Sequence, residues 1–445
     1  MPDPSAIRWL RALLPLLLGL FMVVASPAVR AEITTLTAPR PVVWKDFLGV
    51  NAHFLWFEPG QYRQQMEKLE LLGLEWVRID VHWDRHEPSK GQYRLDELDR
   101  LVGDLHAHRL KSVLYLVGSA PHASVVPRFF PHSDQYPPRD PKLFSAFMVK
   151  LAQRYPSVDA WQVWNEPNLP SFWRPLPNPK GYLQLLRQTA VELQKAAYGK
   201  PVVAGGMAYY SQMPQGGLML EKLGQIGMLD LDMIIAYHPY SLHPEGDVPR
   251  EQDFILRTQW VNKTLRAYKV PGIWATEWGW SSYPGPQEEQ PVIGTEGQAD
   301  YVLRRLALMS ALDFDRIFLF ALSDLDDRAT VRDRSYGLLT RSGTPKPVYH
   351  ALKNFLDITG PRLLPTAPPL VHSAPDDLYS IAWQRDDGKR IWLFWSAKGG
   401  TPVLPGIYQA ELYDPLESAA GTPIATKDGN GIRVQASSQL RMLVW

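Results

Sequence analysis

The sequence predicts an α/β fold, a closed (β/α)8 TIM barrel followed by a small antiparallel β-domain. Short apolar runs rich in β-branched and aromatic residues alternate with longer segments of helical period, and eight such pairs fill residues 40–358. Near-continuous apolar runs indicate strands that are buried on both faces, and strand–helix alternation indicates parallel pairing through right-handed crossovers. Eight units favour closure over an open doubly wound sheet, the alternative, because no nucleotide-binding glycine fingerprint follows the first strand.

Each expected strand is followed by a segment with helical periodicity. The strands are expected at residues 47–54, 76–83, 111–118, 160–165, 201–207, 233–240, 273–280 and 316–324. The helical segments include residues 62–72, 95–108, 143–155, 182–198 and 348–356. Gly205 and Gly206, at the end of the fifth strand, are interpreted as a point of close backbone approach, since glycine inside a strand often marks one.

Residues 359–445 lose the helical period. They contain the short alternating runs LYSIAWQ, RIWLFWSA, YQAELYD and LRMLVW, separated by Gly, Pro and Asp. Such runs are typical of a small antiparallel domain that resembles a β-sandwich. The segment at residues 32–44 is expected to add an edge strand to it.

The composition excludes some classes of partner. The 47 basic and 46 acidic residues nearly cancel, so no electrostatic field attracts nucleic acid. Sixteen Trp and nineteen Tyr exceed what a core needs, and flat rings with a polar edge suit amphipathic ligands such as sugars. The absence of cysteine excludes thiol chemistry and cysteine-ligated metals.

The amino terminus resembles a secretory signal. Basic residues precede an apolar run over residues 13–25, and Val29-Arg30-Ala31 resembles a cleavage site. The run is shorter than the roughly 20 residues that span a bilayer. Residues 1–31 are therefore predicted to be a signal peptide or, alternatively, an N-terminal membrane anchor, and the protein is expected in the periplasm, free or tethered to the inner membrane.

The ends of the expected strands carry the candidate active site, because barrel enzymes use the carboxyl ends of their strands. Glu166 follows the fourth strand and Glu277 the seventh, which lie opposite each other in an eight-strand ring. Candidates for sugar contacts at the strand ends are His53, Arg78, Trp83, His122, Asn165, His238, Tyr240, Trp278 and Trp280.

Two opposed carboxyl groups fit the cleavage of an acetal between sugars. One protonates the leaving oxygen and the other acts on the far side of the anomeric carbon, directly at a separation of about 5 Å or through a water at roughly 6.5 to 9.5 Å. A single glutamate at a strand end is more simply an ordinary acid, solvated or paired with an arginine such as Arg78. Two glutamates at opposed tips, both flanked by tryptophan, favour the catalytic interpretation.

Several motifs carry a family resemblance. WNEPN around Glu166 and TEWGW around Glu277 resemble the two catalytic motifs of clan A glycoside hydrolases. Together with GVNAHF, VRIDVHW, AYHPY and the trailing β-domain, they resemble glycoside hydrolase family 39 over roughly residues 40–445. The resemblance implies Glu166 as acid/base and Glu277 as nucleophile, with Asn165 bonding the sugar 2-hydroxyl. It also implies that Tyr240 or His238 holds Glu277 ionised.

These observations lead to the expectation of a retaining endo-glycosidase that acts on a secreted polysaccharide. A non-hydrolytic polysaccharide-binding or assembly protein and a transglycosylase remain as alternatives. No cofactor is expected, and no metal, since the strand-end histidines lack a HExxH-type spacing. We further expect a monomer that associates with the inner membrane or an exopolysaccharide-assembly apparatus.

Overall fold

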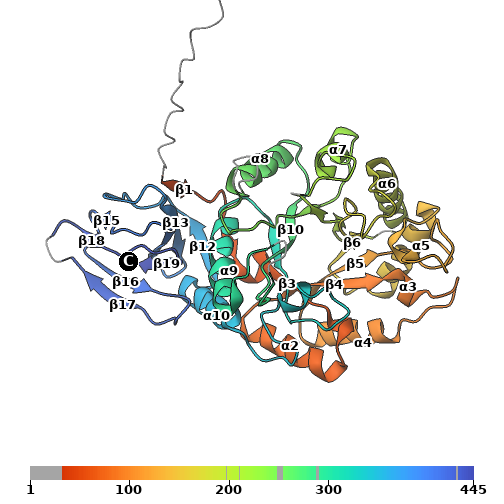
Figure 1. Ribbon diagram of the computed structural model, residues 1–445, viewed down its shortest axis with the longest axis horizontal. Helices are drawn as coiled ribbons and strands as arrows, with labels where there is room; N and C mark the ends of the chain where they lie inside the picture. The colour runs from red at the N-terminus through yellow and green to blue at the C-terminus, as the bar shows by residue number, and fades with distance from the viewer. Residues whose placement is uncertain (1–32, 197, 210, 248–253, 287–289, 427–428) are drawn as a thin grey trace, which may run out of the picture.

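Figure 1 shows the computed structural model of the chain. It describes residues 33–445 except 197, 210, 248–253, 287–289 and 427–428. The predicted signal or anchor at residues 1–31 lies outside the described residues. Within the described part, no helix has the length and apolar character needed to cross a membrane.

Parallel strands form the expected barrel. In chain order they are β3 (Leu48–Asn51), β4 (Trp76–His82), β5 (Lys111–Val117), β6 (Ala160–Val163), β7 (Val202–Ala204), β8 (Met207–Ala208), β9 (Ile235–His238), β10 (Ile273–Trp278) and β11 (Arg316–Leu319). They pair in the order β7-β6-β5-β4-β3-β11-β10-β9-β8. A parallel bridge between Val203 and Ile234 joins β7 to β9 and closes the ring. The predicted fold class is therefore confirmed, although the fifth expected strand is split in two at Gly205 and Gly206.

Helices surround the barrel. They are α1 (Trp44–Phe47), α2 (Pro59–Leu71), α3 (Trp83–His86), α4 (Asp96–Ala107), α5 (Pro141–Arg154), α6 (Pro179–Lys195), α7 (Met219–Gln225), α8 (Phe254–Ala267), α9 (Gly294–Ser310) and α10 (Pro347–Thr359). Short 3-10 turns lie at η2 (Phe54–Trp56), η3 (Ser133–Gln135) and η5 (Asp333–Ser335). Proline begins α2, α5, α6 and α10, a position where its missing N–H costs no hydrogen bond.

An antiparallel sheet follows the barrel. Its strands are β12 (Arg362–Pro365), β13 (Tyr379–Arg385), β14 (Arg390–Trp395), β16 (Gln409–Tyr413), β17 (Thr422–Ala425) and β19 (Arg441–Val444), with β15 (Val403–Leu404) and β18 (Ile432–Arg433) as a separate pair. The amino-terminal strands join this sheet: β1 (Thr34–Leu36) lies parallel to β13, and β2 (Val42–Val43) is antiparallel to β12.

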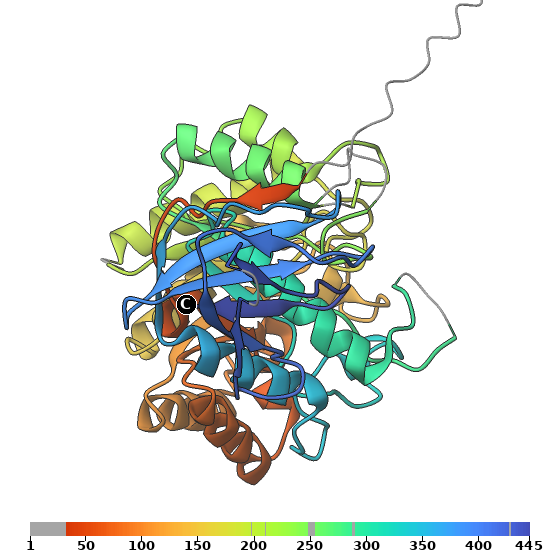
Figure 2. The same ribbon diagram turned by 90° about the vertical axis from the view of Figure 1, so that its left-hand side faces the viewer.

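The two faces of this sheet pack on different partners. Trp383 and Leu393 belong to the large core that includes the barrel helices. Trp392 and Phe394, which point to the opposite face, form a second core with residues of β15 and β18. Figure 1 shows the sheet beside α9 and α10, and Figure 2 shows it in front of the barrel, on the side that these helices form. The sheet is thus continuous with the barrel through a shared apolar core.

This shared core predicts that a cavity in the sheet destabilises the whole described molecule. Leu393 is fully buried, so Leu393→Ala should lower the free energy of unfolding by about 2 to 5 kcal/mol. Leu370, which is 67% exposed, provides the matched control, and Leu370→Ala should change it by less than about 0.5 kcal/mol. Urea unfolding followed by far-UV circular dichroism measures both variants. Equal, small effects of the two substitutions would contradict the shared core.

Candidate active site

A strained turn sets the direction of Glu166 at the end of β6. Trp164 and Glu166 both have positive φ, 74° and 39°. This conformation costs a non-glycine residue on the order of 1 to 3 kcal/mol and persists only where the surroundings impose it. The backbone N–H of Trp164 donates to Leu116 O and that of Glu166 to Gly206 O, each at 2.9 Å. Neighbouring strands therefore hold the turn.

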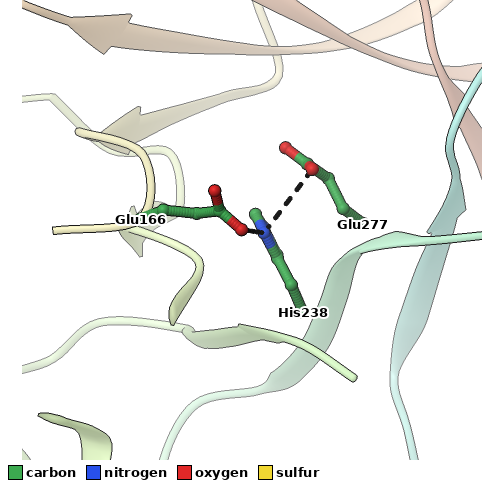
Figure 3. Close-up of side chains that lie close together, drawn as sticks. All are labelled: Glu166, His238 and Glu277. Carbon is green, nitrogen blue, oxygen red and sulfur yellow. Dashed lines mark hydrogen bonds and ion pairs between the residues drawn. The ribbon is translucent and has the colours of Figure 1, made fainter. Parts of the chain in front are cut away.

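The carboxyl groups of Glu166 and Glu277 lie on either side of the His238 ring (Figure 3). Nδ1 of His238 is 2.9 Å from Oε1 of Glu166 and 3.6 Å from Oε2 of Glu277. One oxygen of each carboxyl group and this ring nitrogen all lie within 4.8 Å of one another. Residues 111 positions apart in the sequence thus meet at the carboxyl ends of β6 and β10. Their spacing is close to that of retaining glycosidases and below that of inverting ones.

The guanidinium of Arg78, on β4, is the centre of the site and has no exposed side-chain surface. Its Nη1 donates to Oε1 of Glu277 at 2.6 Å and to Oδ1 of Asn51 at 2.8 Å. Its Nε donates to Oε1 of Gln162 at 2.6 Å, and Nη2 donates to Oδ1 of Asn165 at 2.7 Å. The arginine therefore links four strands, and its buried charge is compensated by the carboxylate.

A second set of contacts fixes the groups that touch Arg78. Nδ2 of Asn51 donates to the carbonyl of Thr276 at 3.0 Å, next to Glu277 in sequence. Nε2 of Gln162 donates to the carbonyl of Ala204 at 3.0 Å. The Tyr115 ring lies against the guanidinium, with the Arg78 Cζ 3.9 Å from the ring centroid. Since each amide oxygen faces a pure donor, the orientation of both amides follows from the network.

The environment gives Glu166 the protonation state of an acid. Burial raises the pKa of Glu166 to about 7, against the smaller lowering effect of the Arg78 charge. Burial lowers the pKa of His238 to about 4, so the ring is neutral near pH 7. Glu277, in contrast, forms an ion pair with the guanidinium, with its Oε1 2.6 Å from Nη1 of Arg78. The two carboxyl groups thus have unequal surroundings, and the burial of Glu166 suits it to hold a proton near pH 7.

His238 occupies its place because Gly206 has no side chain. A Cβ at Gly206 would lie 2.0 Å from Nε2 of His238 and 2.5 Å from Oγ1 of Thr276. That same Nε2 is 3.0 Å from the Thr276 hydroxyl, which orients the ring. At Gly205 an added Cβ would lie 2.7 Å from Oη of Tyr182. The interpretation of these glycines as a point of close backbone approach is confirmed.

Tyr240 contacts the other oxygen of Glu277. Its hydroxyl donates to Oε2 at 3.3 Å, and burial together with the charge of Glu277 raises the pKa of Tyr240 well above its usual value. The loop that carries Tyr240 is clamped by Arg305 of α9, which is fully buried. Arg305 donates to the carbonyls of Pro239 and Pro244, each at 2.7 Å. The clamp fixes the backbone on both sides of Tyr240.

The antiparallel sheet supports the same loop. Nε1 of Trp395, on β14, donates to Oε1 of Glu245 at 2.8 Å, and Arg304 of α9 forms an ion pair with the same carboxylate. Glu245 lies five residues after Tyr240. The sheet therefore contributes to the geometry of the site although it lies outside the barrel.

The tryptophans predicted as stacking platforms are not available to a ligand. Trp83 and Trp280 are each 1% exposed and Trp278 is 0% exposed. Trp83 stacks on Phe147, and Trp280 donates its Nε1 to the carbonyl of Ser241 at 3.1 Å. The interpretation as exposed platforms was wrong, because strand-end tryptophans in this barrel fill the space between strands and helices.

Two predicted histidines lie away from the carboxyl pair. His122 follows β5, with its Nε2 3.7 Å from Oε1 of Glu87, and its ring edge contacts Trp83. His53 follows β3 and packs edge-on against Trp56 and Phe320. Among the described residues, neither histidine forms a hydrogen bond or ion pair with Glu166 or Glu277.

The sequence analysis missed Asp80. This residue of β4 is 3% exposed, and it accepts a hydrogen bond from Nε1 of Trp56 at 3.1 Å. Burial alone would raise the pKa of Asp80, but the hydrogen bond from His82 and the nearby His53 lower it below its ordinary value. Asp80 is therefore ionised. The sequence does contain a signal for Asp80. This residue lies between Arg78 and His82 at a spacing of two, and side chains two apart on a strand share a face.

Asp80 lines a cavity of about 440 Å³ that extends outward between η2, α3 and the start of α4. The other lining residues are Leu55, His82, Arg85, His86, Arg94, Asp96 and Glu97. Oδ1 of Asp80 and Nδ1 of His53 are buried without a hydrogen-bond partner in the described part of the chain. A sugar hydroxyl can donate a hydrogen bond to one atom and accept one from another. The unpartnered carboxylate oxygen and ring nitrogen could therefore both bind such a hydroxyl.

Glu166, His238 and Glu277 also satisfy the geometric criterion for a metal site, since one ligand atom from each lies within 4.8 Å of the others. Nη1 of Arg78 already lies 2.6 Å from Glu277, and its positive charge would repel a cation placed there. The electrostatics thus favour proton chemistry at this pair. The expectation that no metal takes part stays a prediction.

Comparisons with known proteins define the class of fold. No protein-family model matches the chain, and no curated protein matches it. Its structure is similar to a family 39 glycoside hydrolase from Bacteroides cellulosilyticus WH2, at a TM-score of 0.69 and 19% identity over 92% of this chain and 82% of that one. It is also similar to a monomeric beta-xylosidase from Caulobacter crescentus CB15. The TM-score is 0.61 and the sequence identity 17%, over 93% of this chain and 99% of that one.

A GH30 endoxylanase from Clostridium papyrosolvens C71 matches with a TM-score of 0.61 and 12% identity over 93% of this chain and 99% of that one. The chain therefore has the fold shared by these glycoside hydrolases, a barrel with an attached β-domain. At these identities the likeness establishes the fold, and the chemistry is argued from the site.

The raised pKa of Glu166 predicts a pH-dependent contribution to stability. Between its ordinary value of 4.5 and about 7, the folded state keeps a proton that the unfolded state has lost. The contribution of Glu166 to the free energy of unfolding therefore decreases as the pH rises through this window, an effect that Glu166→Gln removes.

The free energy of unfolding of Glu166→Gln, relative to that of the wild type, should therefore increase by up to roughly 3 kcal/mol as the pH rises between those two values. Above about pH 7 the difference between the two proteins should stay constant. Urea unfolding at a series of pH values measures it, and all other titrating groups cancel in the comparison. A difference that does not change with pH would contradict the raised pKa.

Proposed function

We propose that the protein is a retaining glycosidase that cleaves O-glycosidic bonds by double displacement. The observation that carries the proposal is the pair of carboxyl groups with oxygens within 4.8 Å of each other. A retaining mechanism needs its two carboxyl groups about 5 to 5.5 Å apart, whereas an inverting mechanism needs room for a water between them. The unequal surroundings of the two groups support unequal roles.

In this proposal Glu277 is the nucleophile. Its Oε1 is held by Arg78 and its Oε2 by Tyr240, which fix the carboxylate for attack on the anomeric carbon. The bond from the anomeric carbon to the leaving oxygen breaks as the bond to Glu277 forms. Glu166 donates its proton to the departing oxygen, as its raised pKa favours, and then accepts a proton from the water that releases the sugar.

Asn165 would assist the transition state. Arg78 occupies its Oδ1, so the side-chain N–H group of Asn165 is the atom that remains to contact a sugar hydroxyl. The resemblance of the WNEPN motif places this contact at the 2-hydroxyl. A hydrogen bond there strengthens as positive charge develops on the ring, and it therefore lowers the barrier.

We propose a secreted polysaccharide as the substrate, cut within the chain. The cavity of about 440 Å³ beside Asp80 offers space for sugar units beyond the one that reacts. The sequence motifs resemble those of PslG, the exopolysaccharide-operon glycosidase of pseudomonads, and the amino-terminal segment is consistent with export to the periplasm. Digestion of the producer's own exopolysaccharide, with mass spectrometry of the fragments, tests the substrate. Oligosaccharides indicate internal cuts, and single sugars indicate terminal ones.

Substitution of the two glutamates should separate their roles. Glu166→Gln should reduce activity on natural chains by about 100- to 10,000-fold, since proton donation is lost. It should largely spare an aryl glycoside whose leaving group needs no proton. Glu277→Gln should abolish activity on both substrates, because no covalent intermediate can form.

Glu70→Gln, on α2 and far from the pair, is the matched control and should retain full activity. Rates of aryl release and of reducing-end formation give the two readouts. Equal loss of aryl release in Glu166→Gln and Glu277→Gln would show that the assigned roles are wrong. Binding of the polysaccharide without any release of reducing ends by the wild type would favour the non-hydrolytic alternative. Transfer of sugar to an added acceptor in place of water would favour the transglycosylase.

Asp80 should contribute to substrate affinity. Asp80→Asn keeps the shape of the side chain but removes its charge, and a hydrogen bond to a charged group is worth about 1.5 to 3 kcal/mol. We expect KM for the exopolysaccharide to rise by about 10- to 100-fold. Asp376→Asn, at an exposed aspartate of the β-domain, is the control. An unchanged KM in Asp80→Asn would show that Asp80 does not contact the sugar.

A further inference from the structure

Helix α8 and the residues just after it expose large apolar side chains on the outside of the barrel. Leu256, Trp260 and Tyr268 are 53%, 56% and 59% exposed. Leu256, Trp260 and Lys263 are spaced by four and three residues and lie on one face of the helix, whereas Tyr268 and Lys269 follow its end at Ala267. Lys263 and Lys269 are exposed in the same stretch. We call these five residues the α8 patch.

The α8 patch is not required for packing of the helix. The opposite face of α8 supplies Phe254, Val261 and Leu265 to the core, and Asn262 accepts a hydrogen bond from Tyr237 at 2.8 Å. Single exposed apolar residues are common, but Leu256 and Trp260, one turn apart on one face, together with Tyr268 just after the helix, form a cluster that suits contact with another apolar phase. Trp260 and Tyr268 also border a groove of about 230 Å³ between α7 and α8.

The charge of this helix has one sign. Residues 254–270 contain four basic side chains and no acidic one. Arg266 is committed to ion pairs with Asp313 and Asp315. Lys263 and Lys269, in contrast, are exposed and form no ion pair with any residue that the structure describes. A surface that combines Trp and Tyr with exposed lysines is typical of segments that lie in the headgroup region of a membrane.

The patch lies where the described chain begins. Figures 1 and 2 both show β1 beside α8. Arg40, which follows β1, forms ion pairs with the same Asp313 and Asp315 that bind Arg266 of α8. The 32 residues that precede Ile33 include the apolar run at residues 13–25. An amino-terminal segment held in a bilayer would therefore bring α8 close to the lipid surface.

We propose that the α8 patch docks on an anionic phospholipid surface. Trp260, Tyr268 and Leu256 enter the headgroup region, and Lys263 and Lys269 contact phosphate groups. The chemistry favours lipid over polysaccharide, because Leu256 lies beside Trp260 on the same face and offers no flat ring for a sugar. The proposal does not depend on the glycosidase activity, since α8 lies on the outer ring of the barrel and its patch shares no residue with the carboxyl pair.

The absence of cysteine from the chain allows a specific test. Leu256→Cys in the full-length protein is labelled with a fluorophore whose emission shifts to the blue in an apolar environment. Leu71→Cys, at a leucine of α2 that is 61% exposed, is the matched control on another face. The probes are vesicles of phosphatidylcholine with and without phosphatidylglycerol. The emission of the label is measured and not the binding of the protein to vesicles, because an amino-terminal segment could bring every variant to the vesicles.

We expect a blue shift at position 256 with phosphatidylglycerol vesicles and none at position 71. Adding Lys263→Glu and Lys269→Glu should decrease the fraction of label in contact with lipid by about tenfold, as high salt should. Three results would overturn the proposal: no shift at position 256, equal shifts at both positions, or a shift that only the exopolysaccharide causes. Glycosidase activity of each labelled variant, measured separately, should equal that of the wild type.

Discussion

The buried guanidinium of Arg78 is the interaction on which the site depends. It joins Asn51 of β3, Gln162 of β6, Asn165 at the end of that strand and Glu277 of β10, and it supplies the positive charge that compensates a buried carboxylate in the barrel. Removing one partner of a buried ion pair leaves the other uncompensated, at a cost of several kcal/mol. The barrel therefore positions the arginine, and the arginine positions both the nucleophilic carboxylate and the amide beside the acid.

Burial shifts the pKa values of two neighbouring groups in opposite directions: it raises the pKa of Glu166 and lowers that of His238. Glu277 forms an ion pair with Arg78, while Glu166 faces a neutral His238 and keeps its proton to about pH 7. The antiparallel sheet takes part at a distance, because Trp395 holds Glu245 in the loop that carries Tyr240. This contact gives the sheet a role in positioning the site, in addition to packing against the outer helices of the barrel.

The sequence predicts the fold class and the carboxyl pair because both follow from strong local patterns. An apolar strand with a polar tip is visible in single segments, and parallel strands bring such tips to one end of a barrel. The burial of Trp278 and Trp280 was not predictable, since a strand-end tryptophan looks the same whether it fills a core or faces a ligand. Asp80 was missed for a related reason: its ionised, partly unpartnered state arises from Trp56 and His82, and only the tertiary structure brings these groups together.

The anomeric configuration of the first product tests the central claim most directly, since the spacing of the carboxyl groups determines the stereochemical course. Proton NMR, recorded in the first minutes of hydrolysis before mutarotation, distinguishes the two anomers. Oxygens of Glu166 and Glu277 within 4.8 Å of each other match the spacing of retaining pairs and fall short of the roughly 6.5 to 9.5 Å that admits both a sugar and an attacking water, so the account predicts retention. A product of inverted configuration would contradict it.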